Sequence, residues 1–256
     1  LNDWLEADQL EHAVKVLTAP AVGQGLVAAN KAMVELLLGG VTVDRNRRTS
    51  ETSPKLRVID FEDASPSGGN NFTAVCQFRV RVLGSDREII PDIVLFVNGL
   101  PLVVIECKSP KQNDWQAEAI DQLLRYSEQR GDAGGPSCGE GSEALFRYNA
   151  FTVITCRTEA QFGTITTRSP KHFYAWSDPY PLSVQELDHG ASGPNAQQRL
   201  VAGMLSLRNL LDLVRDFTLF GTDERGHGIK IVARYQQFRA VKKAVARLVA
   251  GQNPHD

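Results

Sequence analysis

The stretch from Ile89 to Lys108 constrains the fold more than any other part of the chain. It contains two apolar runs that are separated by Asn98 and Gly99. An Asn-Gly pair between two hydrophobic runs favours the two-residue turn of a β-hairpin, because both turn positions need a positive φ angle. We therefore predict two antiparallel strands, joined by this turn and apolar enough to be buried.

Three charged residues interrupt the apolar runs: Asp92 near the start of the first predicted strand, and Glu106 and Lys108 at the end of the second. Residues two apart on a strand share a face, so Glu106 and Lys108 are expected to point the same way and Cys107 into the core. The turn folds the second strand back along the first, which brings Asp92 alongside Glu106. Two carboxylates and an ammonium group are thereby predicted to converge at the edge of a sheet.

This grouping has the chemistry of a magnesium site that cleaves phosphodiesters. Mg²⁺ is held by one or two carboxylates, keeps several waters and bridges to phosphate oxygens. It polarises the phosphoryl group and activates a bound water, while a nearby lysine can orient that water or neutralise developing charge. The alternative is an exposed glutamate–lysine pair at a strand end. Charged groups are costly beside such apolar runs unless they have a role, which favours the metal site.

A helix is predicted to follow the hairpin, within residues 113–130. This segment has no Gly or Pro, and its apolar residues recur at helical spacing. Gln122 and Tyr126 are four residues apart, so they share a face and could together contact a DNA backbone or support Lys108. An ordinary amphipathic helix is the alternative explanation of the same pair.

The composition indicates a globular protein without disulfides or a zinc site. The chain has 256 residues, of which 42% are hydrophobic and 23% charged, enough to form a large core. It has no apolar run long enough to span a membrane and no signal-peptide pattern at its start, so we expect a cytoplasmic protein. The four cysteines and five histidines are scattered. Those cysteines that fall in strand-like runs are expected to be reduced and buried: Cys76, Cys107 and Cys156.

The net charge of −2 argues against an autonomous, non-specific DNA-binding protein, which usually has a strong basic excess. Positive residues form modest clusters at 45–48, 108–111 and 234–247. A nuclease that receives DNA from other parts of a larger enzyme does not need tight binding of its own. The charge therefore favours a nuclease of that kind.

Elsewhere the pattern predicts both helices and strands. Residues 1–40 read as two helices. The Gly-rich stretch from Gly131 to Ser142 is expected to be a solvated loop, because it lacks the Gly-Lys-Ser/Thr ending of a phosphate-binding loop. The remaining predictions are strands at 56–61, 72–83, 149–156 and 163–176, a loop at 186–198 and an amphipathic helix at 200–217.

The hairpin also resembles a known nuclease motif. Pro91-Asp92 followed by Glu106-Cys107-Lys108 is similar to the PD-(D/E)xK motif. The longer run from Pro91 to Pro110 resembles the restriction (HsdR-type) subunit of type I restriction-modification enzymes. That family carries a Gln-x-x-x-Tyr motif on the helix after the lysine strand, which Gln122 and Tyr126 match. Shorter similar stretches lie at 58–61, 70–72, 77–80, 163–165, 209–211 and 230–237.

The resemblance implies an α/β restriction-endonuclease-like (PD-(D/E)xK) core, with a central mixed sheet flanked by helices. It implies a type I site-specific deoxyribonuclease that uses Mg²⁺ to hydrolyse duplex DNA. Asp92 and Glu106 would be the metal ligands and Lys108 would lie beside the attacking water, while Gln122 and Tyr126 would support the DNA or the lysine. The implied partners are double-stranded DNA and the specificity and methylation subunits of a type I complex, with no membrane involved.

The end of the chain resembles the entry into a superfamily 2 helicase-like motor. Gln237, within residues 235–240, matches the adenine-recognising segment of that motor; the alternative is that it lies on a charged, solvated helix. We therefore expect a nuclease domain over residues 1–217 and a linker with the start of a truncated motor over residues 218–256. Cleavage would follow ATP-driven translocation, with ATP bound only in the full-length subunit.

The chain begins with Leu rather than Met and stops before any phosphate-binding loop, so we expect a fragment of a larger subunit. In the family an upstream helix supplies a further acidic residue near the metal, and Glu6 or Glu11 could take that place. Two alternatives remain open, a freestanding repair or defence nuclease of the same fold and a catalytically silent DNA-docking module. The presence of all three of Asp92, Glu106 and Lys108 argues against a silent module, and the motor-like tail argues against a freestanding nuclease.

Overall fold

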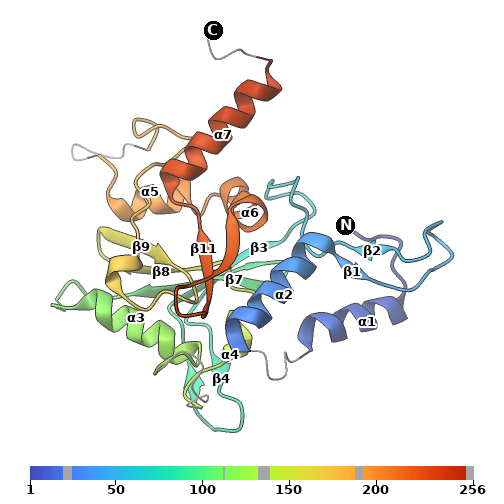
Figure 1. Ribbon diagram of the computed structural model, residues 1–256, viewed down its shortest axis with the longest axis horizontal. Helices are drawn as coiled ribbons and strands as arrows, with labels where there is room; N and C mark the ends of the chain where they lie inside the picture. The colour runs from blue at the N-terminus through green and yellow to red at the C-terminus, as the bar shows by residue number, and fades with distance from the viewer. Residues whose placement is uncertain (20–24, 112, 132–138, 188–192, 252–256) are drawn as a thin grey trace.

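The protein has a mixed α/β fold around one central five-stranded sheet (Figure 1). The computed structural model describes residues 1–19, 25–111, 113–131, 139–187 and 193–251. The strand order is β3-β6-β7-β8-β9, in which β7 and β8 are parallel and every other neighbouring pair is antiparallel. The five strands are β3 (Phe72–Cys76), β6 (Ile93–Val97), β7 (Leu100–Cys107), β8 (Phe151–Cys156) and β9 (Glu159–Gly163).

The remaining elements flank this sheet or extend from it (Figure 1). The helices are α1 (Ala7–Thr18), α2 (Gly25–Gly39), α3 (Trp115–Tyr126), α4 (Glu143–Phe146), the 3₁₀ helix η1 (Pro170–His172), α5 (Ala196–Gly203), α6 (Leu207–Asp216) and α7 (Tyr235–Val249). Three strand pairs lie outside the central sheet: β1 (Val41–Thr42) with β2 (Lys55–Leu56), β4 (Val80–Arg81) with β5 (Glu88–Ile89), and β10 (Thr218–Thr222) with β11 (Gly228–Val232). Among the described helices, none combines the length and the apolar character needed to cross a membrane.

The predicted hairpin forms β6 and β7 at the middle of the sheet. Its turn residues Asn98 and Gly99 have φ angles of 52° and 80°, the left-handed conformation that the two-residue turn requires. Ile93 pairs with Ile105, and the same register places Asp92 opposite Glu106. The predicted convergence of these two residues is therefore present in the backbone itself.

Both faces of the sheet are covered, and alternate residues of β7 enter two different cores. Val104 packs with apolar residues of α3, such as Ile120 and Leu123. Val103 and Ile105 pack in the opposite core, which includes residues of α5 and α6. Since side chains alternate along a strand, the residue after Ile105 must point toward the α3 layer. That residue is Glu106.

Several predicted elements have other bounds in the structure, because local side-chain hydrogen bonds end them early. The predicted strand at 56–61 is reduced to β2, since the Asn70 side chain bonds the backbone of Asp60 and Asp63 and holds that segment in a turn. The predicted strand at 72–83 is split into β3 and β4 at Gln77, whose φ angle is +53°.

The predicted helix at 200–217 is two helices, α5 and α6. The buried Asn209 side chain donates to the carbonyl of Gly203 at 2.6 Å and to that of Tyr180 at 2.6 Å, which stabilises the break between them. The predicted strand at 163–176 is wrong over most of its length, because β9 ends at Gly163 and after that residue only Tyr174 of this stretch forms a β-bridge, with Phe162 of β9. The helices predicted within residues 1–40 and the strand within 149–156 are confirmed. Residues 132–138 of the Gly-rich stretch, with Cys138, and residues 188–192 of the predicted loop lie outside the described part of the chain.

The C-terminal elements are in contact with the rest of the protein. In α7, Phe238 is buried against Trp176, with ring centroids 5.6 Å apart. Lys242 of the same helix forms an ion pair of 2.8 Å with the buried Asp212 of α6. The domain boundary at residue 217 stays a prediction.

Lys230 of β11 is a buried lysine whose ammonium group forms no ion pair among the described residues. Its nitrogen donates to the side-chain oxygen of Asn30 at 2.8 Å and to the carbonyl of Asn149 at 2.5 Å. These two hydrogen bonds tie β11 to α2 and to the residues that precede β8. Burial lowers the pKa of Lys230 from its ordinary value of 10.5 to about 7.

This burial predicts a pH-dependent stability. Between about pH 7 and pH 10.5 the unfolded chain holds the Lys230 proton and the folded protein does not, so the free energy of unfolding should rise with pH across this window. The contribution can reach at most about 1.4 kcal/mol per pH unit. Lys230→Met should remove this dependence in chemical unfolding measured at several pH values. Lys31→Met, at the neighbouring exposed lysine of α2, should keep it, and the same pH dependence in all three proteins would contradict the prediction.

Candidate active site

Asp92 lies immediately before β6 and is held by backbone and side-chain hydrogen bonds. One carboxylate oxygen accepts a hydrogen bond of 2.8 Å from the backbone N–H of Cys107, and the other accepts one of 2.8 Å from the side-chain amide of Gln77. The backbone N–H of Gln77 also donates to the Asp92 carbonyl at 2.8 Å. The Asp92 carboxylate is therefore fixed between β3 and β7 while part of it stays exposed.

Glu106 is fully buried, and among the described residues neither of its carboxylate oxygens has a hydrogen-bond partner. Its closest cation is Lys108, whose nitrogen lies 3.8 Å from one oxygen. Loss of hydration, reinforced by the negative charge of Asp92, raises the pKa of Glu106 to about 8, despite the opposing effect of Lys108. An unpartnered buried carboxylate is costly, so this side chain fits poorly with a purely structural role.

A chain of hydrogen bonds connects Lys108 to α3 and back to the strand that carries Asp92. The Lys108 ammonium donates to the side-chain oxygen of Gln122 and lies 3.9 Å from Glu118. The Gln122 amide donates to the hydroxyl of Tyr126 at 2.6 Å, and this hydroxyl donates to the Ile90 carbonyl at 3.1 Å. Burial raises the pKa of Tyr126, so its hydroxyl keeps the proton that it donates. The structure thus brings Gln122 and Tyr126 to the lysine.

The expectation for the cysteines is wrong at two positions. Cys107 and Cys76 are exposed, and only Cys156 of the three is buried. Glu106 and Lys108 do share a face, as predicted, but that face is the covered one. Cys107 is exposed because β7 ends at this residue, where the layer on the opposite face of the sheet no longer covers the strand.

Two carboxylates in this arrangement suit a magnesium ion better than a softer metal. Among the described residues there is no group of three or more histidine, cysteine, aspartate or glutamate side chains that could enclose a metal. Mg²⁺ needs only one or two carboxylates and completes its coordination with water and phosphate oxygens. The unpartnered oxygens of Glu106, opposite the anchored Asp92, fit that requirement.

Three other residues considered from the sequence lie outside this group. Glu6 precedes α1, and Glu11 within α1 forms an exposed ion pair with Lys15. The Gln237 side chain accepts a hydrogen bond of 2.9 Å from the backbone N–H of Arg234, so it caps its own helix. None of these contacts involves the carboxylates at the end of the hairpin.

Sequence reasoning missed two residues that contact the site. Gln77 holds both the backbone and the side chain of Asp92, and Glu118 approaches Lys108 from the exposed side of α3. Gln77 falls in the stretch 77–80 that resembles the family, but its residue type gave no further signal. Glu118 could have been found from its spacing, since it lies four residues before Gln122 on the same helix face.

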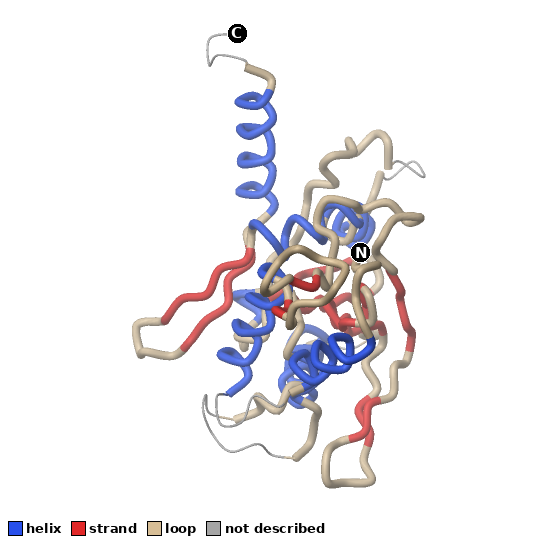
Figure 2. The backbone as a smooth tube through the Cα atoms, turned by 90° about the vertical axis from the view of Figure 1, so that its right-hand side faces the viewer, coloured by secondary structure: helices blue, strands red, loops and turns tan. Residues whose placement is uncertain are grey.

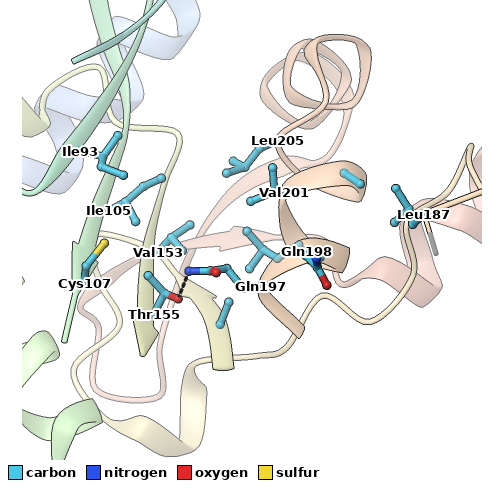
Figure 3. Close-up of a pocket in the computed structure, with 13 residues that line it drawn as sticks. Ile93, Ile105, Cys107, Val153, Thr155, Leu187, Gln197, Gln198, Val201 and Leu205 are labelled. Atoms are coloured by element: carbon cyan, nitrogen blue, oxygen red, sulfur yellow. Dashed lines mark hydrogen bonds between the residues drawn. The ribbon is translucent and has the colours of Figure 1, made fainter. Parts of the chain in front are cut away.

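The opposite face of the hairpin borders an apolar cavity of about 350 Å³ (Figure 3). Ile105 and Cys107 face it from β7, and Leu205 and Val201 from the segment around α5. Gln197 is hydrogen-bonded to Thr155 at its edge, at 2.9 Å. Among the described residues no carboxylate lines this cavity, whereas Glu106 and Lys108 lie on the α3 side of the sheet.

Comparison with known proteins assigns the chain to a family. The model of the type I restriction enzyme R protein N terminus (HSDR_N) matches residues 1–171. The chain belongs to this family. All the residues of the hairpin and of α3 discussed above fall within the matched region.

Relatives with similar sequences are endonuclease subunits by name. The type I restriction enzyme HindI endonuclease subunit of Haemophilus influenzae is 31% identical over 248 residues, which is 96% of this chain and 21% of that protein. A Methanocaldococcus jannaschii protein, whose name provisionally assigns it to the MjaIXP enzyme as endonuclease subunit, is 26% identical over 100% of this chain and 24% of its own length. This R protein N-terminal region therefore spans about a fifth to a quarter of the length of these relatives.

The burial of Glu106 predicts that this side chain lowers the free energy of unfolding of the protein. Glu106→Leu removes a buried carboxyl group that has no partner, and should raise the free energy of unfolding by about 1–3 kcal/mol in the absence of metal. Glu159→Leu, on the exposed side of β9, is the control and should change stability little. Chemical unfolding of the two variants and the unchanged protein measures the difference. If Glu106→Leu were no more stable than the unchanged protein, this prediction would be wrong.

Proposed function

We propose that this chain is the nuclease part of a type I restriction enzyme subunit, with a restriction-endonuclease-like core of the PD-(D/E)xK type. It would hydrolyse phosphodiester bonds of duplex DNA with Mg²⁺. The observation that carries this proposal is the buried and unpartnered carboxylate of Glu106 beside Asp92 and Lys108. Membership of the family and the endonuclease names of the relatives support it.

Asp92 and Glu106 would hold the metal. A bound Mg²⁺ would supply Lewis-acid polarisation of the phosphate and lower the pKa of a coordinated water. The two carboxylates lie opposite each other across β6 and β7, so the rigid hairpin fixes their spacing. The hydrogen bonds from Cys107 and Gln77 hold the Asp92 carboxylate in one orientation before any substrate arrives.

Lys108 would act on the attacking water and on the charge that develops at the phosphate. Its side chain is nearly buried, which makes its charge effective because little solvent screens it. The Gln122 side-chain oxygen accepts a hydrogen bond from the Lys108 ammonium and limits its orientation, and the Gln122 amide is held in turn by the Tyr126 hydroxyl. Gln122 and Tyr126 are therefore positioning residues that act through Lys108, with a further contact to the DNA backbone proposed for them.

The rest of the enzyme would deliver the DNA. In this proposal a motor that follows the nuclease region translocates DNA with ATP, and specificity and methylation subunits select the site, all in the cytoplasm. Gln237 would contact adenine only in the full-length subunit. The low net charge agrees with a nuclease that does not bind DNA tightly by itself.

The first test is removal of each member of the trio. In a type I enzyme assembled from intact subunits, Asp92→Ala and Glu106→Ala should abolish DNA cleavage while ATP hydrolysis continues, because only the nuclease ligands are lost. Lys108→Ala should also lose cleavage but still bind metal, which isothermal titration with Mg²⁺ measures. Glu11→Ala, at an exposed carboxylate of α1, is the matched control and should cleave normally.

Near-normal cleavage by Asp92→Ala or Glu106→Ala would refute the site. Cleavage by the isolated chain without ATP would instead favour a freestanding nuclease, and absence of cleavage in every setting would favour a silent DNA-docking module.

The second test separates the positioning residues from the metal ligands. Tyr126→Phe removes one hydroxyl that joins Gln122 to the Ile90 carbonyl, and should slow cleavage without changing its dependence on Mg²⁺ concentration. Gln122→Ala should act in the same direction with a larger effect, since it contacts Lys108 directly. Cleavage rates measured over a series of Mg²⁺ concentrations give both the maximal rate and the Mg²⁺ concentration that cleavage requires. A shifted Mg²⁺ requirement in either variant would mean that these residues act on the metal instead.

A further inference from the structure

A two-stranded ribbon leaves the sheet next to Asp92. It comprises residues 77–91, in which β4 and β5 pair as an antiparallel hairpin. At its base, the N–H of Gln77 donates to the Asp92 carbonyl and that of Phe78 to the Pro91 carbonyl, at 2.8 and 3.2 Å. The tip of the ribbon projects from the body of the molecule in both views (Figures 1 and 2). The residues that anchor the ribbon are thus the same residues that position the candidate metal ligand.

The two faces of this ribbon differ in chemistry. Val82 and Ile89 are buried, so they attach the ribbon to the core under α3. Arg79, Arg81 and Leu83 alternate with the inward residues and are exposed, Leu83 to 96%. An apolar side chain exposed to this degree at a ribbon tip contributes nothing to the folded core.

Arg81 is the cation on this face that is free to bind a partner. Its side chain forms no hydrogen bond or ion pair within the described part of the chain, because Glu88, which lies opposite Arg81 in the ribbon, pairs with Arg79 at 3.0 Å. Arg87 is engaged by Ser85 and the Gly139 carbonyl. The ribbon therefore offers one unpaired arginine, one arginine held by a competing carboxylate, and an apolar tip.

We propose that the outward face of this ribbon binds duplex DNA beside the scissile phosphate, with Arg81 and Arg79 on the backbone and Leu83 in the adjoining groove. This inference rests on the proposed nuclease function. A strand rises about 3.3 Å per residue, so the four steps from Gln77 to Arg81 cover about 13 Å. That length equals the axial rise of about four base pairs of duplex DNA. A duplex whose phosphate lies at Asp92 would therefore extend along the ribbon.

The ligand follows from charge and position together. Arginine on a two-stranded ribbon is suited to phosphate and groove contacts, and the ribbon continues directly from the residues that would meet the scissile phosphate. Glu88 opposes such binding, because it neutralises Arg79 and faces the incoming phosphates. The ribbon is thus poised for moderate rather than tight binding.

The experiment measures the affinity of the chain for a short fluorescent DNA duplex at several salt concentrations, with Ca²⁺ replacing Mg²⁺ to prevent cleavage. Arg81→Ala should weaken binding about two- to fivefold and reduce the salt slope by about one. Glu88→Gln should tighten binding by a similar factor, because it releases Arg79. Leu83→Ser should weaken binding without changing the salt slope, since no charge is lost.

The matched control is Arg225→Ala. Arg225 is an exposed arginine on the turn between β10 and β11, a hairpin that projects on the opposite side of the molecule (Figure 2). The Arg225→Ala substitution changes the net charge by the same amount as Arg81→Ala and should leave the affinity for the duplex nearly unchanged. Melting temperatures of all variants should match that of the unchanged protein, because the substituted side chains are exposed.

Equal affinities of Arg81→Ala and Arg225→Ala would overturn the proposal, as would a Glu88→Gln variant that binds no more tightly. Asp92→Asn distinguishes this failure from failure of the proposed function. If only the ribbon assignment is wrong, Asp92→Asn still abolishes cleavage in the assembled enzyme. If the nuclease assignment is wrong, Asp92→Asn cleaves normally whatever the ribbon variants do.

Discussion

The burial of a carboxylate at the end of a strand that is covered on both faces governs the rest of this structure. Strand geometry sends Glu106 to the α3 side once Val104 and its neighbours are in their cores. There the carboxylate loses its water without gaining a hydrogen bond, which raises the pKa of Glu106 to about 8. A protein built for stability alone would place an apolar side chain at this position. The site retains instead a carboxyl group that would suit the metal ion proposed above.

The residues around Glu106 hold the other two members of the trio, Asp92 and Lys108, in fixed positions. Asp92 is fixed by Cys107 and Gln77, and Lys108 is fixed through Gln122. The chain of hydrogen bonds then returns to the backbone two residues before Asp92. Helix α3 is thus bonded both to Lys108 and to the backbone close to Asp92. Such preorganisation agrees with the proposed phosphodiester hydrolysis, since positioning supplies much of the rate of phosphoryl transfer.

Two buried charged residues show how differently a fold can treat them. Lys230 is buried with two oxygen acceptors, and it joins the C-terminal hairpin to α2 and to the start of β8. Glu106 is buried without a hydrogen-bond partner in the part of the chain that the structure describes. The first arrangement stabilises a junction at a cost that depends on pH, whereas the second leaves its oxygens available to a ligand. Burial alone therefore does not mark a functional group; Glu106 is singled out because its buried carboxyl group lacks a hydrogen-bond partner among the described residues and lies beside Asp92 and Lys108.

The sequence by itself determined the hairpin, the pairing of Asp92 with Glu106 and the helix that carries Gln122 and Tyr126. These features depend on local rules: the Asn-Gly turn, the two-residue period of strands and the spacing along one helix face. The tertiary structure decided which face of β7 is covered, so Cys107 emerged exposed and Glu106 buried. It also decided the contact of Gln77 with Asp92 and the break at Gly203, because Gln77 must meet the start of β6 and Asn209 must meet the Tyr180 carbonyl, which lies far from it in the sequence. Local periodicity fixes how residues alternate along a strand, but the layers that pack against each face decide which of those residues are buried and how much free energy their burial costs.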